Sequence, residues 1–433
     1  MKFIFPILAI MHVTIGWGQE VRLLSQTEAL EEAMENNKTV QISGKQMEEN
    51  LGNYRQTQAI FLPNIQVSYT GITTNNPLMA FGSKLNQEIL TPSDFDPNLL
   101  NNPNRTTNFA TKIEVQQPLI NMDGVYQRKA AKAQYDASQL QWQRTKDYIV
   151  FETQKAYMQL QLAYQGLTVL NKAKEAAQAN LKLAQNSFVQ GYLQKADLLA
   201  VEVRVTEVEN QLQFAKSQIK NASDYLAVLM GSELHLVLKP SDSLISVPTM
   251  DLSLDYAENR ADIKAMTYAS EAYKNAFQAD KMAFLPRLNA FGSYELYDNE
   301  IFQADANGYL VGASLSWNVL DGSKRFGQTQ KSKASYEKSK LELEQYKLES
   351  QRTFRQAKRM LEDALNSLEL SKLALQQSEE SLRIRTNRYK EGLEKTSDLL
   401  MAETQYAQKQ LEYYQSIFQY NYTQAYLSFL TKE

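Results

Sequence analysis

Two acidic side chains, Asp197 and Asp398, occur at equivalent positions of two similar segments of this sequence. Each lies six positions after a glycine, in the segments NSFVQGYLQKADLL (186–199) and NRYKEGLEKTSDLL (387–400). A carboxylate at the start of a helix accepts hydrogen bonds from free backbone N–H groups, and the helix dipole stabilises its charge. The simplest interpretation is that both aspartates are N-caps of the helices that follow them.

Residue types that support catalysis or metal binding are scarce. The histidines are His12 and His235, cysteine is absent, and we find no phosphate-binding glycine loop, nucleophile motif or paired-carboxylate motif. His235 is expected to be a loop residue, and the 13 scattered methionines are expected to be packing residues. The sequence therefore predicts no enzyme activity, no metal site and no cofactor, and a net charge of −3 gives no reason to expect nucleic acid.

The two aspartate segments belong to a longer internal duplication. FLPNIQVSYT (61–70) returns as FLPRLNAFGSY (284–294), and PLINMDG (118–124) returns as NVLDG (318–322). Each copy reads as two strands, a very long helix, a break marked by glycine and a second helix. The sequence thus predicts two structural repeats.

Periodicity, prolines and turn residues give the expected bounds of these parts. Repeat 1 covers 19–230, a non-periodic connector covers 231–259, and repeat 2 covers 260–433. The expected strands are 62–74, 107–119, 286–298 and 308–320. The expected helices are two within 22–60, then 123–187, 196–230, 260–284, 322–389 and 396–430. The segment 75–108, rich in Asn, Pro and Ser, is expected to be a long loop.

The N-terminal residues 1–18 have the pattern of a secretory signal peptide. Lys2 precedes an apolar run, and Gly16 and Gly18 supply small residues before a cut at Gln19. No later stretch reaches 18 uncharged apolar residues, so a mature chain that crosses a membrane must do so as a β-barrel. Four strands are too few to close a barrel, which needs about eight, so several copies would have to pool their strands.

Two other classes of protein remain as alternatives at this stage. Any single alternating strand also fits a half-buried sheet of a soluble protein. A periplasmic structural coiled coil would explain the apolar residues spaced 3 and 4 apart from Leu198 to Leu229, but it has no use for four strands or for the segment 75–108.

In their order and duplication, these segments resemble the TolC family of outer-membrane efflux proteins (the outer membrane factors). The parts that carry the resemblance are the two FLP strand starts, the turns QQPLINMDG and SWNVLDG, and the two G-x5-D-L-L breaks at 191–199 and 392–400. The resemblance covers essentially the whole mature sequence. It implies an α+β membrane protein, a homotrimer with a 12-stranded outer-membrane β-barrel that takes four strands from each chain. The resemblance further implies that the β-barrel continues into a long periplasmic α-helical barrel of coiled-coil hairpins. The connector and terminal segments would form an equatorial belt around this helical barrel.

The function implied by the resemblance is that of an exit duct in the outer membrane of a Gram-negative bacterium, extending into the periplasm. Such a duct is a passive channel in a tripartite efflux or export system. A periplasmic adaptor (membrane fusion) protein opens it at its periplasmic tip, and the adaptor is coupled to an inner-membrane pump of the RND or ABC type. Outer-membrane lipid surrounds the barrel, and one role for the segment 75–108 would be a cover over the outer mouth of the channel. The channel of type I protein secretion is an alternative within the family. A channel specialised for metal efflux is a further alternative, although this sequence contains no M-x-x-M cluster that would support it.

The resemblance also assigns residues to the periplasmic tip. Asp197 and Asp398 match aspartates of the family's two breaks, and three copies of each would form a carboxylate ring that favours cations. Tyr389 matches an aromatic residue that hydrogen-bonds in the closed state. The hairpin tips that would face the adaptor are formed by Gly191, Tyr192, Leu193, Gly392, Leu393 and Glu394.

Two positions of the aperture depart from the family pattern. The innermost constricting aspartate falls on Met401, whose ring would be a hydrophobic constriction, and Glu403 lies nearby but out of register. A gating arginine falls on Glu394. The sequence therefore does not support the family's salt-bridge lock at rest, nor the cation selectivity that goes with it.

Overall fold

The computed structural model describes residues 21–248 and 255–432, so the proposed signal peptide and part of the connector lie outside the described residues. The chain divides into two compact units. The first comprises Met1–Gly44, Trp142–Ala261 and Lys347–Glu433, and the second comprises Lys45–Gln141 and Asp262–Tyr346. We describe each unit by itself.

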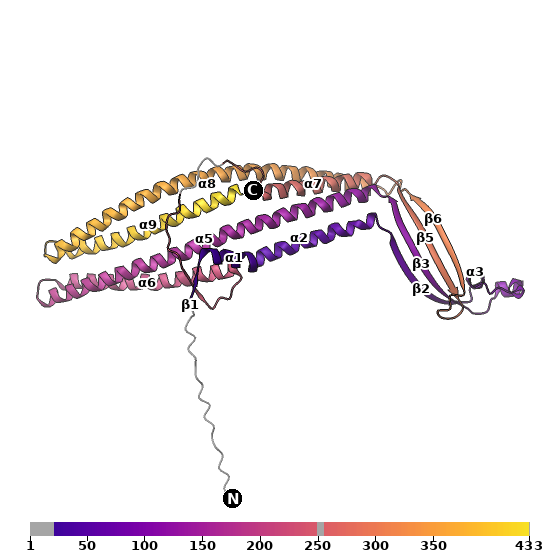
Figure 1. Cartoon of the computed structure of the whole chain (residues 1–433), viewed down its shortest axis with the longest axis horizontal. Helices are drawn as coiled ribbons and strands as arrows, with labels where there is room; N and C mark the ends of the chain where they lie inside the picture. Colours follow the sequence, from indigo (N-terminus) through magenta and orange to yellow (C-terminus); the bar gives the residue numbers. More distant parts are fainter. Residues whose placement is uncertain (1–20, 249–254, 433) are drawn as a thin grey trace, which may run out of the picture. The chain divides into compact units, whose positions relative to one another are not determined.

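The second unit is built on a four-stranded antiparallel sheet (Figure 1). Its strands are β2 (Asn64–Thr74), β3 (Thr106–Ile120), β5 (Arg287–Asp298) and β6 (Ala306–Ser316), and they are hydrogen-bonded in the order β2-β3-β5-β6. The register aligns Val67, Ile113, Tyr294 and Tyr309 across the sheet. Since paired residues share a face, the alternating apolar residues of all four strands lie on one side, as the sequence predicted.

The apolar face of this sheet is uncovered within the unit. Val67 is 66% exposed, Val311 75% and Leu315 69%. The opposite face carries polar groups, where Lys112 Nζ lies 3.2 Å from Glu114 and 3.5 Å from Glu295. A half-buried sheet of a soluble protein would cover its apolar side, whereas the apolar side of this sheet is exposed within the unit.

The expectation of an irregular loop over 75–108 was wrong. Within it lie α3 (Pro77–Asn86), the 3₁₀ turn η2 (Pro92–Phe95) and α4 (Pro97–Asn101). Each begins with proline in its first turn, which suits proline because the N–H it lacks would be unpaired there. Asn76 accepts a hydrogen bond as the N-cap of α3, and Lys84 pairs with Asp94 at 2.7 Å. Asn-Pro and Asp-Pro steps often mark loops, whereas Asn76–Pro77 and Asp96–Pro97 start helices here.

This folded segment is attached to the ends of the strands through one buried side chain. The Gln87 amide donates hydrogen bonds to the carbonyl oxygens of Thr107 and Asp298, at 2.9 and 3.0 Å, and to Asn108 Oδ1 at 2.7 Å. Gln87, Asn108 and Asp298 are all buried. This hydrogen-bond network therefore holds the segment against the ends of β3 and β5.

Further helices flank the strands. They are α2 (Lys38–Gln56), the 3₁₀ turn η1 (Thr57–Ile60), α7 (Ala261–Met282), and the start of the long helices α5 (Met122–Val189) and α8 (Lys324–Lys390). At the entry to α5, the buried carboxylate of Asp123 accepts two hydrogen bonds from Arg287, at 3.1 and 2.5 Å. The strand-to-helix turn is thus fixed by a bidentate ion pair.

The first unit is closed by a short parallel strand pair that the sequence did not predict. β1 (Val21–Leu24) pairs with β4 (Val237–Pro240), which lies in the connector, and α1 (Gln26–Asn36) follows β1. The Tyr157 hydroxyl donates to Leu24 O at 2.9 Å. The buried core beneath includes Leu24, Ala29, Ala33, Tyr157, Leu160, Leu226, Met230 and Leu238.

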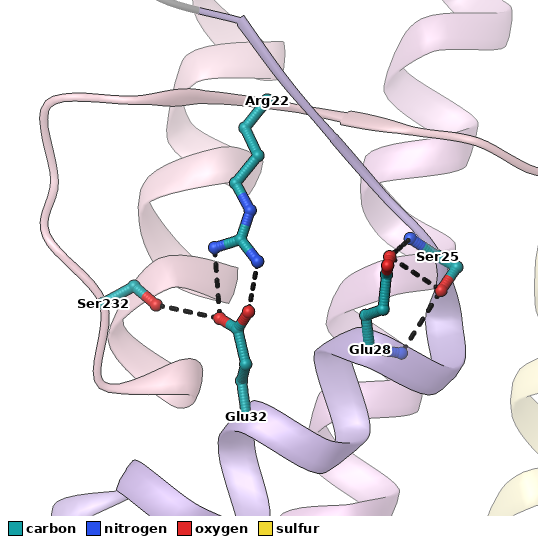
Figure 2. Close-up of polar contacts among 5 residues, drawn as sticks. All are labelled: Arg22, Ser25, Glu28, Glu32 and Ser232. Carbon is teal, nitrogen blue, oxygen red and sulfur yellow. Dashed lines mark hydrogen bonds and ion pairs between the residues drawn. The ribbon is translucent and has the colours of Figure 1, made fainter.

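Polar contacts hold the N-terminal segment in place, as Figure 2 shows. Ser25 and Glu28 form a capping box at the start of α1, with bonds of 2.8 to 3.2 Å. Glu32 pairs with Arg22 and accepts a 3.3 Å hydrogen bond from Ser232, which follows α6 (Lys195–Met230). The contact joins β1, α1 and the end of α6.

Two helical hairpins complete this unit, formed where α5 turns into α6 and where α8 turns into α9 (Thr396–Thr431). The predicted heptad seam of α6 is buried at Leu198, Val201, Val208, Leu212, Ile219, Leu226 and Leu229. Across 21–248 and 255–432, none of the helices has the length together with the hydropathy that a membrane-crossing helix requires.

Candidate functional site at the hairpin turns

The two hairpin turns share one backbone design. Gly191 and Gly392 have φ of +76° and +70°, in the left-handed region that favours glycine. In the first turn, the N–H of Gly191 donates to Phe188 O at 3.0 Å and that of Tyr192 donates to Ser187 O at 2.9 Å. The second turn has the same two bonds, at 3.0 and 2.9 Å. This is the Schellman motif, in which glycine ends one helix and reverses the chain.

The interpretation of Asp197 and Asp398 as N-caps was wrong. The N-cap residues are Gln194 and Lys395, both extended and without a side-chain capping bond. The aspartates lie in the first turn of α6 and α9 instead. The left-handed glycine reverses the chain so tightly that the helix resumes before the aspartate is reached. Their charge still lies near a helix N-terminus, where the dipole stabilises it.

The first turn is closed by apolar packing. Leu193 packs with Leu198 and Val201 at the start of α6, together with Ala184 and Leu181 on α5. Leu400 of α9 joins the same cluster. The second side chain after the glycine, Leu193, therefore belongs to a small core that also links the two hairpins.

The second turn is closed by charge at the equivalent position. Glu394 accepts hydrogen bonds from Arg385 Nη1 at 2.6 Å and Arg388 Nε at 2.7 Å, and its side chain is 10% exposed. Glu394 stands where the family has a gating arginine, which put the family's salt-bridge lock in doubt, and within this chain it forms ion pairs with two arginines of α8. A signal for these ion pairs was present, since both arginines lie in the last two turns of α8 and face the returning chain.

The other predicted site residues take different positions. The Tyr389 hydroxyl lies 3.5 Å from Thr396 Oγ1, a contact at the outer limit of a hydrogen bond. Tyr192 and Leu393 are 83% and 67% exposed, and Met401 is 60% exposed. The structure thus leaves Tyr192, Leu393 and Met401 open to solvent within one chain. Leu193 and Glu394, which were also assigned to the tips, pack inward instead.

Glu403, which the sequence places out of register with the aperture, lies at a contact between α9 and α5. Its carboxylate accepts a hydrogen bond from the Asn180 side chain, so it joins α9 to α5. Burial raises the pKa of the Glu403 carboxyl to about 7, and the Arg204 guanidinium and the Asn180 hydrogen bond offset part of that rise. Among the described residues, no group of three or more acidic or histidine side chains is placed to hold a metal ion.

The chain matches one protein family and is similar to several solved structures. The family model "Outer membrane efflux protein" matches residues 29–232 and 252–431. The outer membrane channel CmeC of Campylobacter jejuni is similar with a TM-score of 0.82 and 14% identity, over 94% of this chain and 85% of that one. The outer membrane protein VceC of Vibrio cholerae is similar with a TM-score of 0.79 and 16% identity, over 93% of this chain and 94% of that one.

A third solved structure, the open state of the Neisseria gonorrhoeae MtrE outer membrane channel, has a TM-score of 0.76 and 15% identity, over 94% of this chain and 88% of that one. No curated protein sequence matches the chain. The structural likenesses establish the fold, a mostly helical chain with a small antiparallel sheet. The family match confirms the resemblance drawn from the repeated motifs: this chain belongs to the outer membrane efflux proteins and is a protein of the outer membrane that extends into the periplasm.

Proposed function

We propose that this protein is the outer-membrane exit duct of a tripartite efflux system. In this proposal it is a homotrimeric passive channel that an adaptor protein opens at the hairpin turns, with an inner-membrane pump as the source of energy. The observation that carries the proposal is the sheet of the second unit, whose apolar face is exposed and whose outer strands, β2 and β6, each have one partner among the described residues.

The strand order supports assembly by identical copies. The sheet has four antiparallel strands, so its edge strands β2 and β6 run in opposite directions. Strand β6 of one copy can therefore pair with β2 of the next in the same antiparallel manner as the strands within the chain. Three copies give a closed ring of about twelve strands, and closure removes the exposed edges that would otherwise aggregate.

The hairpin turns support the contact with an adaptor. Tyr192 and Leu393 are large apolar side chains at the two tips, and both are strongly exposed. Exposed aromatic and aliphatic residues at a rigid tip are typical anchors of a protein interface. The Schellman turns hold them in a defined position.

Copurification tests the partners. The intact complex is crosslinked in membranes, extracted in mild detergent and its components identified by mass spectrometry. We expect an adaptor and an inner-membrane pump of the RND or ABC type; recovery of an ABC transporter together with a secreted protein would favour type I protein secretion instead. Tyr192→Asp with Leu393→Asp should abolish adaptor recovery, whereas Leu341→Asp, at an exposed position of α8, should not.

Conductance in planar bilayers tests the channel. We expect Tyr389→Phe combined with Asp197→Ala to raise conductance, because it removes the hydroxyl near Thr396 and a charge from the first tip. Tyr192→Phe, which removes an exposed hydroxyl, is the matched control. Replacing 77–104 by a short linker tests whether this segment covers the outer mouth, and an unchanged current would exclude that role. A purified protein that is a water-soluble monomer without detergent would overturn the proposal.

A further inference from the structure

The two helical hairpins touch near their turns through one side of α9. Leu400 packs into the apolar cluster of Leu198 and Val201. Glu403, nearly one helical turn later and therefore on the same side of α9, accepts the hydrogen bond from Asn180. The contact thus consists of an apolar part and a single carboxyl group, both close to the turns that would have to move apart when a channel opens.

The surroundings of Glu403 do not fully compensate a negative charge. The side chain that bonds to it from α5, Asn180, is neutral. From α6 the buried Arg204 acts on it electrostatically, but this guanidinium is shared with Glu207, whose Oε2 lies 3.5 Å from Arg204 Nη1. Glu403 is partly buried, and the loss of water around its carboxyl outweighs the stabilisation of its charge by Arg204 and by the Asn180 hydrogen bond, so the contact favours the protonated form.

Charged groups on the other helices are engaged elsewhere. On α8, Arg385 and Arg388 are paired with Glu394, and Glu379 acts on Tyr406, one turn further along α9. Glu403 is an ionisable group of α9 that hydrogen-bonds across this contact, so its charge and the contact between the hairpins influence each other.

We propose that Glu403 forms a proton-dependent latch between the two hairpins, closed when its carboxyl is protonated and weakened when the carboxyl ionises. The inference rests on the proposed function of a channel that opens at these turns. Acid pH then holds the tip closed, and neutral pH lowers the free energy that a docking adaptor must supply.

The direction and size of the effect follow from linkage between protonation and contact. The pKa of Glu403 is about 7 in the closed contact, above its usual value of 4.5, so the closed form binds the proton more tightly. Closure is favoured at low pH, weakens as the pH rises from 4.5 toward 7, and is nearly constant above 7. With these two values, the closing equilibrium constant falls about 40-fold between pH 5 and pH 7.

Spin labelling measures the latch directly. The chain has no cysteine, so Tyr192→Cys and Leu393→Cys give specific labels on the two exposed tips. Electron–electron distance measurements on the purified full-length protein in detergent then report the fraction with the tips close together. We expect this fraction to correspond to a closing constant that falls about 40-fold from pH 5 to pH 7.

Three variants separate the latch from a general effect of pH. Glu403→Gln keeps the shape and the acceptor oxygen but cannot ionise, and it should stay closed at both pH values with less than about a twofold change. Glu207→Gln frees Arg204 to act on Glu403 alone, so it should lower the pKa of Glu403 and reduce the pH response. Glu391→Gln, which removes an exposed carboxylate outside this network, should follow the wild type. Circular dichroism checks that each variant keeps its helix content. A pH response in Glu403→Gln equal to that of the wild type, or no response in the wild type, overturns the latch.

Bilayer conductance of the same proteins keeps the two proposals apart. A pH-dependent distance change without any channel current would uphold the latch and refute the duct. A channel current that is the same at pH 5 and pH 7 in wild type and Glu403→Gln would uphold the duct and refute the latch.

Discussion

The ionic closure of the second turn gives a sharp prediction for Glu394→Gln. The carboxylate accepts bonds of 2.6 and 2.7 Å from Arg385 and Arg388, and it is nearly buried. Hydrogen bonds between charged groups contribute about 1.5–3 kcal/mol each, but Arg388 is 56% exposed, so solvent reduces its share. We expect a loss of about 2 kcal/mol in the local stability of this turn, since glutamine keeps one weaker acceptor.

Hydrogen exchange followed by mass spectrometry measures that loss where it occurs. A change of 1.4 kcal/mol is a factor of ten, so amides in 385–399 should exchange about 30-fold faster in the variant. Peptides from 184–198 are the internal control, because the first turn is closed by Leu193 and its apolar neighbours. Glu391→Gln, at an exposed neighbouring position, is the matched variant control.

Ionic strength tests the same reasoning without a mutation. High salt should speed exchange in the second turn of the wild type, leave the first turn unchanged, and have little further effect on Glu394→Gln. Equal exchange in both turns of the variant, or a salt response that the variant shares, would refute the assignment of this turn's stability to the two ion pairs.

Three further substitutions probe other parts of the chain. Gly392→Ala should destabilise its turn by about 1 kcal/mol, seen as roughly fivefold faster local exchange, because φ is +70° there. Arg287→Ala leaves the buried Asp123 carboxylate without its bidentate partner and should lower unfolding stability by about 2–3 kcal/mol, measured by thermal unfolding in detergent. Tyr157→Phe removes the hydrogen bond to Leu24 and should cost about 1 kcal/mol, detected as faster proteolysis of the N-terminal segment.

Local patterns in the sequence were sufficient for features that depend on neighbouring residues. A period of two along β2 places Val67 on the same face as its partner Ile113, and a glycine between two helices specifies a left-handed turn such as that at Gly191. The long helices and the seam of α6 likewise follow from spacing alone.

The features that sequence reasoning missed depend on residues far apart in the chain or on a choice between two local structures. The carboxyl of Glu403 meets Asn180 more than 200 positions earlier, and no spacing rule connects them. The step at Asn76 begins either a loop or a capped helix, and the contact between Lys84 and Asp94 favours the helix only once the segment is folded. Asp197 was misplaced because the exact residue at which a helix resumes is set by turn geometry.

The pairing of β1 with β4 has a consequence for when this chain can fold. Val21 is aligned with Val237, so the earliest described strand has no partner until roughly half of the polypeptide has been delivered. Hairpins such as α5–α6 can form earlier from residues close in sequence, whereas the β1–β4 pair that holds the amino-terminal segment can form only after β4 has been synthesised. Folding should therefore pass through an intermediate in which the helical hairpins are formed but the amino-terminal segment is not yet docked. A chaperone would bind this intermediate best, because its apolar surface is still exposed.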